Sequence, residues 1–297
     1  MLLDGNHDFE LLCKFFFLIS FRVLFLNYLS LKIPLTSIVK SRAILYTSLF
    51  AIFIISLMIA FTSAGFPYSG SIAEPRVQRH YVTHTRRTFY DLDGDVRFSD
   101  KGFFIKENER NTKRTLETFL DGRKLLPKDD QVLCALEAFC GVPSYNMSNG
   151  FWMYSESRPV VQPTRLTMTS RSEDEDLVEI SFEIVGELLT LIFIAPEPGV
   201  VLTESSIGFS SREWIEGRIA HFLKITYGKP SSDPMKFTLK FEKSRDLNDL
   251  VKITVVTIDS HFDKSPMSSE FKDFVDSFPD YTFVQVHQAD LSSFTFQ

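Results

Sequence analysis

The chain has 297 residues, of which 24% are charged and 44% hydrophobic, and its formal net charge is -6. Charges of both signs are interspersed and form no long basic stripe, which excludes the electrostatic footprint of a nucleic-acid-binding protein. The most apolar stretches lie near the N-terminus, so the sequence predicts a membrane region over residues 1–68 and one globular domain over residues 69–297.

Two apolar segments lie within the membrane region. The segment 15–33 contains Arg22 and Asn27, whose placement at the centre of a bilayer requires pairing or snorkelling. The segment 43–64 contains no charged residue and has the length that a helix needs to cross about 30 Å of hydrocarbon. It is too long and too far from the N-terminus for a cleavable signal core. We therefore expect a transmembrane helix at residues 43–64, alone or in a helical hairpin with residues 15–33.

The charges beside these segments predict an orientation. The loop between them holds Lys32, Lys40 and Arg42 without an acidic residue, and the positive-inside rule places such a loop in the cytoplasm. If both segments cross, the globular domain then lies in a lumen or outside the cell. Arg76 and Arg79, beyond the second segment, favour the opposite orientation.

Two features of the globular domain fit the luminal side. Cys134 and Cys140 are candidates for a disulfide, although two cysteines in a cytosolic domain would more often be buried thiols. Asn146 opens an Asn-Met-Ser glycosylation sequon in a segment that reads as a surface loop. Because disulfides and N-glycans form on the oxidising, glycosylating side of a membrane, the two features support each other.

The globular domain reads as mainly β. Beyond the breaker-rich residues 66–71, apolar residues mostly alternate with a period of two, which predicts strands. Many short strands separated by turn residues favour a β-sandwich or jelly-roll-like domain with a few short helices. Helices are predicted at 129–139 and at 268–277, where serines can cap the first turn. The predicted strands are 77–82, 177–185, 188–195, 218–226, 235–242, 251–258 and 281–287.

Two acidic segments resemble cation sites only superficially. Residues 91–95 read Asp-Leu-Asp-Gly-Asp, but an EF-hand loop has its glycine at the sixth position and a glutamate at the twelfth, where this chain has Gly102. An acidic turn between two strands is the favoured interpretation. Residues 173–176 are four consecutive acids before a strand, which is typical of a solvated loop, with weak cation binding as the alternative.

A His-x-Asp pair is the sharpest candidate for metal chemistry. His261 and Asp263 could supply two zinc ligands from one strand. A hydrolytic zinc site needs three or more protein ligands and an open position, and usually a carboxylate base. The other histidines have no HExxH spacing, so the second half of such a site is not visible. A structural role for His261 is favoured, and the sequence predicts no catalytic residue, metal or other cofactor.

Several landmarks, taken in order along the chain, resemble one family. They resemble the end of the last membrane span and the C-terminal luminal domain of the endoplasmic reticulum metallopeptidases, the Fxna-related branch of the M28 zinc peptidases. The resemblance covers roughly residues 43–297. The landmarks are residues 66–69, the sequence RHYVTHTRRTFYDLDG at 79–94, Cys134 with CGVP at 140–143, FPDYTF at 278–283, and Asp290 with Leu291.

The resemblance implies a domain in the lumen of the endoplasmic reticulum, beside its membrane, and a Cys134–Cys140 pair. Family members begin with a large peptidase domain and a multi-span region that this chain does not contain. No catalytic residue can therefore be carried over. A truncated paralogue and the tail of a longer gene product both fit this difference.

The leading hypothesis is a non-catalytic, membrane-anchored luminal domain with a structural or interaction role. Its expected partners are the lipid bilayer and a protein in the lumen, and nucleic acid is excluded. One alternative is zinc peptidase activity through His261 and Asp263. Another is a sandwich that binds glycans, lipids or proteins through exposed Trp152 and Trp214, although burial of both tryptophans is the more common outcome.

Overall fold

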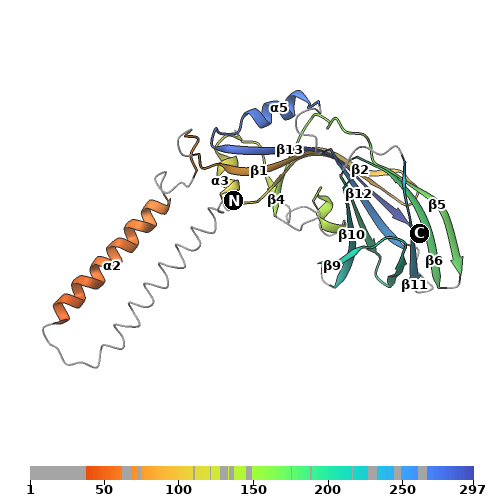
Figure 1. Cartoon of the computed structure of the whole chain (residues 1–297), viewed down its shortest axis with the longest axis horizontal. Coiled ribbons are helices and arrows are strands. Elements are labelled where there is room, and N and C mark those ends of the chain that lie inside the picture. The colour runs from red at the N-terminus through yellow and green to blue at the C-terminus, as the bar shows by residue number, and fades with distance from the viewer. Residues whose placement is uncertain are drawn as a thin grey trace. The chain divides into compact units, whose positions relative to one another are not determined.

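The chain forms two compact units, Met1–Arg76 and Val77–Gln297, shown in Figure 1. They are seen in a computed structural model. The structure describes residues 38–61, 68–71, 75–109, 111–120, 122–127, 133, 137–144, 149–174, 176–187, 189–215, 217–226, 233–243, 249–259 and 266–297.

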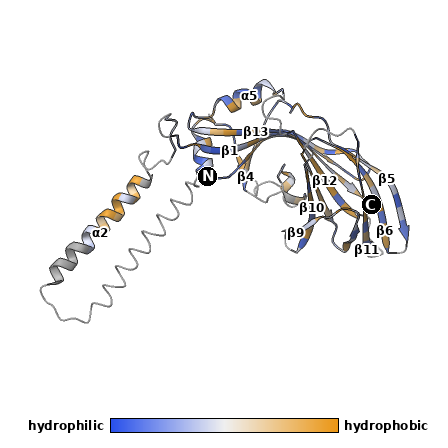
Figure 2. Ribbon diagram, in the orientation of Figure 1, coloured by the Kyte–Doolittle hydropathy of each residue, from blue (hydrophilic) through white to orange (hydrophobic). Residues whose placement is uncertain are grey.

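The first unit contains the helix α2, Ile38–Phe61. Its sequence is apolar on all sides over residues 46–59, and large side chains such as Phe50, 66% exposed, lie on its surface. Figure 2 shows hydrophobic residues along this helix. Among the described residues, no helix combines the length and apolarity that a bilayer crossing requires. The helix predicted over 43–64 is present in large part, its role as a membrane span is not confirmed, and the segment 15–33 lies outside the described residues.

The second unit is mainly β and is built on a nine-stranded sheet. Its strand order is β3-β4-β2-β1-β13-β12-β7-β10-β9. The central pair, β1 with β13, is parallel, and the other pairs in the sheet are antiparallel. The strands are β1 Gln78–Tyr90, β2 Val96–Lys106, β3 Leu126–Pro127, β4 Gly150–Tyr154, β7 Leu189–Pro196, β9 Ser210–Ile215, β10 Arg218–Thr226, β12 Val251–Asp259 and β13 Thr282–Phe296.

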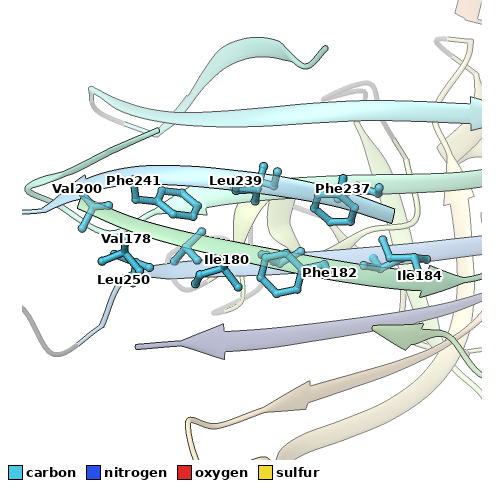
Figure 3. Packing of buried hydrophobic residues seen from close by; sticks show 14 residues of the cluster. Val178, Ile180, Phe182, Ile184, Val200, Phe237, Leu239, Phe241 and Leu250 are labelled. Carbon is cyan, nitrogen blue, oxygen red and sulfur yellow. The ribbon is translucent and has the colours of Figure 1, made fainter. Parts of the chain in front are cut away.

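A second sheet of four strands covers one part of the first. Its order is β5-β6-β11-β8, with β5 Arg165–Asp174, β6 Leu177–Val185, β8 Val200–Ser205 and β11 Met235–Lys243. Alternate residues of β6 and β11 point inward, as Figure 3 shows for Phe182 and Phe237. They form one cluster with residues of β7 and β12, such as Ile192 and Val255. The two sheets are therefore packed face to face across this core.

Helices cover another part of the large sheet. The helix α5, Ser269–Asp276, begins where the Ser268 hydroxyl accepts a hydrogen bond from the Phe271 amide, an N-cap that satisfies one free amide of the first turn. Its buried Phe271 and Phe274 pack on β2 and β4 together with the short helix α3, Thr112–Glu117. Figure 1 shows α5 along β13 and β1.

Sequence and structure agree on the central strands. The seven predicted strands are present, and the helix predicted at 268–277 is α5. β1 and β13 run further than predicted, to Tyr90 and Phe296. The second half of β1 is polar from residue 83 to residue 88, so apolar alternation does not reveal it, although most of these residues are buried. The two-sheet packing holds over only part of the large sheet, since α5 and α3 cover the rest. Most of the helix predicted at 129–139 lies outside the described residues, and its end is the 3-10 helix η4, Ala138–Gly141.

Candidate binding pocket

A polar band separates the two apolar clusters on one face of the large sheet. Side chains alternate between the faces of a strand, so Val82 of β1, which packs under α5, shares its face with Arg86. Arg86 lies opposite Asp290 of β13, and Asp290 lies opposite Thr257 of β12. Two residues further along β12, Val255 belongs to the core under the second sheet. Polar residues therefore cross three neighbouring strands between the two cores.

An open pocket of about 810 Å³ lies where this band reaches the edge of β2. β4 pairs only with residues 102–106 of β2, so residues 96–101 form an edge in the described structure. The chain that leaves β4 at Tyr154 closes the pocket on another side. The lining residues are Arg86, Thr88, Tyr90, Val96, Ser99, Asp100, Lys101, Tyr154, Ser155, Glu156, Arg158, Pro163, Thr164, Asp290 and Ser292.

The ion pair between Arg86 and Asp290 forms the floor of the pocket. Arg86 Nε donates to Asp290 Oδ1 at 2.6 Å, and the Asp290 side chain is 1% exposed while that of Arg86 is 26% exposed. The other carboxylate oxygen, Oδ2, accepts from the Thr164 amide at 2.7 Å. Thr164 Oγ1 lies 2.9 Å from Thr257 Oγ1. Asp290 therefore has a charge partner and a hydrogen bond at each oxygen, as a buried carboxylate requires.

Residues 155–164, here called the strap, are tied to the sheet and to α5 by side-chain acceptors. Glu270 Oε2 accepts from the Ser157 amide at 2.8 Å and from Ser155 Oγ at 2.9 Å. Burial alone would raise the pKa of Glu270, but these hydrogen bonds lower the pKa below its ordinary value. Gln288 Oε1 accepts from the Val160 amide at 2.7 Å. The strap is thus fixed at both ends and in its middle.

A second ion pair, between Arg87 and Asp100, lies on the opposite face of the sheet, and Asp100 also lines the pocket at the edge of β2. Arg87 Nε donates to Asp100 Oδ1 at 2.7 Å, and a second guanidinium nitrogen bonds the other oxygen of Asp100. The Arg87 guanidinium lies 3.6 Å from the ring centroid of Trp152, which is fully buried. Trp152 is therefore part of the interior, and the interpretation of Trp152 as an exposed contact is wrong.

The exposed side of the pocket carries an aromatic ring and charged groups. Tyr154 is 58% exposed, and its ring meets Trp152 edge-on with the centroids 6.4 Å apart. The Lys101 ammonium donates to the backbone oxygen of Glu156, which fixes the start of the strap. On the sheet face, Tyr90 stacks on Phe294 with the ring centroids 4.8 Å apart.

The two histidines of the 79–94 landmark lie in the core. His84 packs between Phe103 and Phe271, and His80 contacts Phe278 with ring centroids 5.2 Å apart. Burial lowers the pKa of each histidine to about 4, so both are neutral near pH 7. In the part of the chain that the structure describes, no group of three or more His, Cys, Asp or Glu residues is arranged to hold a metal ion.

Most of the sequence-predicted site residues lie outside the described residues. This holds for His261, Asp263, Cys134 and Asn146, and for the side chain of Trp214. Cys140 is buried and takes part in a disulfide. Because Cys134 is not described, its role as the partner of Cys140 stays a prediction.

The acidic segments have structural roles. Asp91 Oδ1 accepts from the amides of Asp93 and Asp95, which makes residues 91–95 the predicted acidic turn between β1 and β2. Glu173 forms ion pairs with Arg171 and Lys243 at the end of β5. Sequence reasoning did not find the pocket, although Arg86 and Asp290 both lie in family landmarks. The sequence signal for this pair was two opposite charges, each a few residues beyond the end of a predicted strand.

The fold and pocket define a mainly β domain with a preformed polar pocket. The family model of the endoplasmic reticulum metallopeptidase 1 C-terminal domain matches residues 75–294. The chain therefore belongs to this family.

The curated relatives that match are much longer. Endoplasmic reticulum metallopeptidase 1 of Homo sapiens is 21% identical over 238 residues, which are 77% of this chain and 26% of the human protein. The Mus musculus protein is 21% identical over 249 residues, which are 82% of this chain and 27% of the mouse protein. The chain spans about a quarter of the length of these relatives.

Two solved structures give weak matches. The Fcho1 mu homology domain of Danio rerio with a bound Eps15 peptide has a TM-score of 0.34 and 8% identity, over 75% of this chain and 98% of that chain. The yeast delta-COP-I mu-homology domain complexed with a Dsl1 WxWxV peptide has a TM-score of 0.32 and 15% identity, over 75% of this chain and 99% of that chain. TM-scores of this size carry no argument about fold or function.

Proposed function

We propose that the chain is a non-catalytic binding domain, anchored to the membrane of the endoplasmic reticulum with its β domain in the lumen. The observation that carries the proposal is the pocket beside β2. Its floor is held by the bonds of Asp290 to Arg86 and to the Thr164 amide, and its wall by the bonds of Glu270 to residues 155 and 157. Because these groups are already ordered, a ligand would bind with little loss of conformational entropy.

The chemistry of the lining supports binding rather than catalysis. It consists mainly of hydroxyl, carboxylate, guanidinium and ammonium groups, and it contains no histidine or cysteine. The most buried carboxylate, Asp290, is bonded to Arg86 and to the Thr164 amide. A general base must reach a proton of the substrate, whereas both oxygens of the 1% exposed Asp290 carboxylate are directed at these protein partners.

The anchor in this proposal is α2 with the apolar residues around it. The support is the uncharged sequence at 43–64 and the exposed apolar side chains on α2, which water solvates poorly. We expect the full-length chain to stay with the membrane pellet after extraction at high pH. Release into the supernatant would contradict the anchor.

The luminal orientation is tested with the sequon at Asn146. The full-length chain, expressed in cells, should show a glycosidase-sensitive shift that disappears in Asn146→Gln. Protease protection of the β domain in intact microsomes should accompany the shift. An unshifted chain whose β domain is digested from the cytosolic side would reverse the proposed orientation.

The zinc content of the purified protein tests whether the chain is a zinc peptidase. Protein purified without chelators should contain far less than stoichiometric zinc, and His261→Ala should leave the zinc content unchanged. Stoichiometric zinc that is lost in His261→Ala would instead support a zinc peptidase.

A further inference from the structure

We propose that the pocket beside β2 binds a neutral carbohydrate chain. The inference rests on the proposed binding role of this pocket and adds the chemical class of the ligand. A volume of about 810 Å³ lies within the range of roughly 300–1,000 Å³ that is typical of small-molecule sites. A short oligosaccharide therefore suits the pocket.

The polar groups of the lining match a neutral ligand with many hydroxyls. The lining carries three cationic and three carboxylate side chains, so its formal charge is balanced. It also carries seven residues with a hydroxyl group. An ionised phosphate or carboxylate ligand can only accept hydrogen bonds and would meet the carboxylates of the lining, whereas each sugar hydroxyl both donates and accepts. A neutral polyol can use both kinds of group.

Tyr154 lies at the edge of the pocket, on the sheet face of Trp152 and Arg87 and opposite to that of the Arg86–Asp290 pair, and there it provides an aromatic surface. Its ring is 58% exposed and is held from one side by the edge-on contact with buried Trp152. An exposed aromatic ring offers an apolar face for the C–H groups of a sugar ring, and the tyrosine hydroxyl offers a hydrogen bond at its rim. Tyr90, fixed by its stack on Phe294, adds a second ring to the lining.

The edge of β2 favours a sugar over an extended peptide. Strand addition needs an open row of backbone groups, but the Ser155 amide already donates to the backbone oxygen of Lys101 at 3.1 Å. The edge also carries the charged residues Arg97, Asp100 and Lys101, and charged side chains are a common protection of strand edges against pairing. The polar groups that stay accessible at the edge of β2 can instead form hydrogen bonds with sugar hydroxyls.

The test uses the full chain, purified in a detergent without a sugar headgroup. Isothermal titration calorimetry would measure binding of mannotriose, maltotriose and chitotriose, with sialyllactose and inorganic phosphate as anionic probes. We expect at least one neutral trisaccharide to bind at millimolar concentration or below. Binding of the anionic probes alone, or no binding of any neutral sugar, would overturn the inference.

Matched variants locate the binding. Tyr154→Ala should weaken the affinity by about ten-fold or more, as expected for an aromatic anchor. Phe283→Ala removes an aromatic ring with the same exposed fraction, 58%, which lies outside the lining, and should leave the affinity unchanged. Equal losses in both variants, at unchanged thermal stability, would place the sugar elsewhere.

The inference and the proposed function can fail separately. If the chain binds a neutral sugar but its β domain is digested from the cytosolic side, the inferred ligand class holds and the proposed luminal orientation is wrong. If the chain is glycosylated and membrane-bound but binds no neutral sugar, the proposed orientation and anchor hold and the inferred ligand class is wrong.

Discussion

Arg86 and Asp290 are 204 positions apart in the chain and lie directly opposite each other on the parallel strands β1 and β13. Their ion pair closes the polar band between two apolar cores, at the place where the first and last strands of the domain meet. The ion pair therefore joins the first and last strands of the domain and forms the floor of its pocket.

Asp290→Asn should destabilise the domain. The substitution keeps the size of the side chain and removes the charge that pairs with Arg86, leaving a partly buried guanidinium without its partner. We expect the free energy of unfolding to fall by about 2–3 kcal/mol. This is less than the cost of breaking a fully buried ion pair, because Arg86 is 26% exposed and water can solvate part of its charge. Urea unfolding followed by tryptophan fluorescence would measure the loss.

The control is an exposed ion pair on α3. Lys113 and Glu117 are 3.9 Å apart, and both side chains are 60% exposed. Lys113→Ala should change the free energy of unfolding by less than about 0.5 kcal/mol, because solvent screens such pairs. Similar losses in Lys113→Ala and Asp290→Asn would remove the special role of the Arg86–Asp290 pair.

Gly102→Ala should also destabilise the domain. A Cβ at Gly102 would meet the backbone oxygen of Met153 and, at 2.8 Å, ring atoms of Trp152, so β4 and the tryptophan would have to shift. Overpacking of this kind costs about 1–3 kcal/mol. Gly208→Ala is the control, because a Cβ there meets nothing within 4 Å. The thermal midpoints of both variants would be compared, and an unchanged midpoint for Gly102→Ala would show that the close contact relaxes freely.

Hydrophobic alternation was enough to place the central strands. Residues 177–185 and 251–258 alternate or remain apolar over a full strand, and both are strands in the structure. β5 gives a much weaker signal, because this edge strand is exposed along nearly its whole length and has apolar side chains only at Leu166 and Met168. The parallel pairing of β1 with β13 joins residues about 200 positions apart, and no local pattern encodes such a partner.

The pocket was invisible in the sequence for a related reason. In the sequence, Arg86 and Asp290 look like ordinary surface charges beyond the ends of two predicted strands. Only the register of β1 and β13 brings them together around a buried carboxylate. The sequence did predict the acidic turn at residues 91–95, because an Asx turn is local chemistry.

Acid should destabilise the domain through its buried histidines. The pKa of His80 is about 4 in the folded chain, against an ordinary value of 6.5. Above pH 6.5 the ring is neutral in both states and stability does not depend on it. As the pH falls from 6.5 to 4, the unfolded chain binds a proton that the folded chain does not, so stability declines and then levels off. The full loss is roughly 3 kcal/mol for such a shift.

His80→Phe tests this dependence. The variant keeps an aromatic ring against Phe278 and cannot bind a proton, so the loss of stability between pH 7 and pH 5 should be smaller than in the wild type. Urea midpoints at pH 7, 6 and 5 would measure it, and equal midpoints at pH 7 and 8 provide the baseline. An unchanged acid sensitivity in His80→Phe would assign the effect to other groups.

Glu270→Ala should loosen the start of the strap without unfolding the domain. Glu270 accepts the hydrogen bonds of the Ser157 amide and the Ser155 hydroxyl, and these are lost in the variant. The Thr164 amide keeps its bond to Asp290, so the far end of the strap should stay protected. Hydrogen exchange at Ser157 should accelerate by about five- to thirty-fold, the effect of losing one or two net hydrogen bonds. Asp273→Ala removes an exposed acid from the same helix and should leave this exchange unchanged. Equal acceleration of exchange at Ser157 and Thr164 in Glu270→Ala would contradict this expectation and would mean that the strap opens as one unit. The wall of the pocket would then depend on the hydrogen bonds that Glu270 of α5 accepts from the strap.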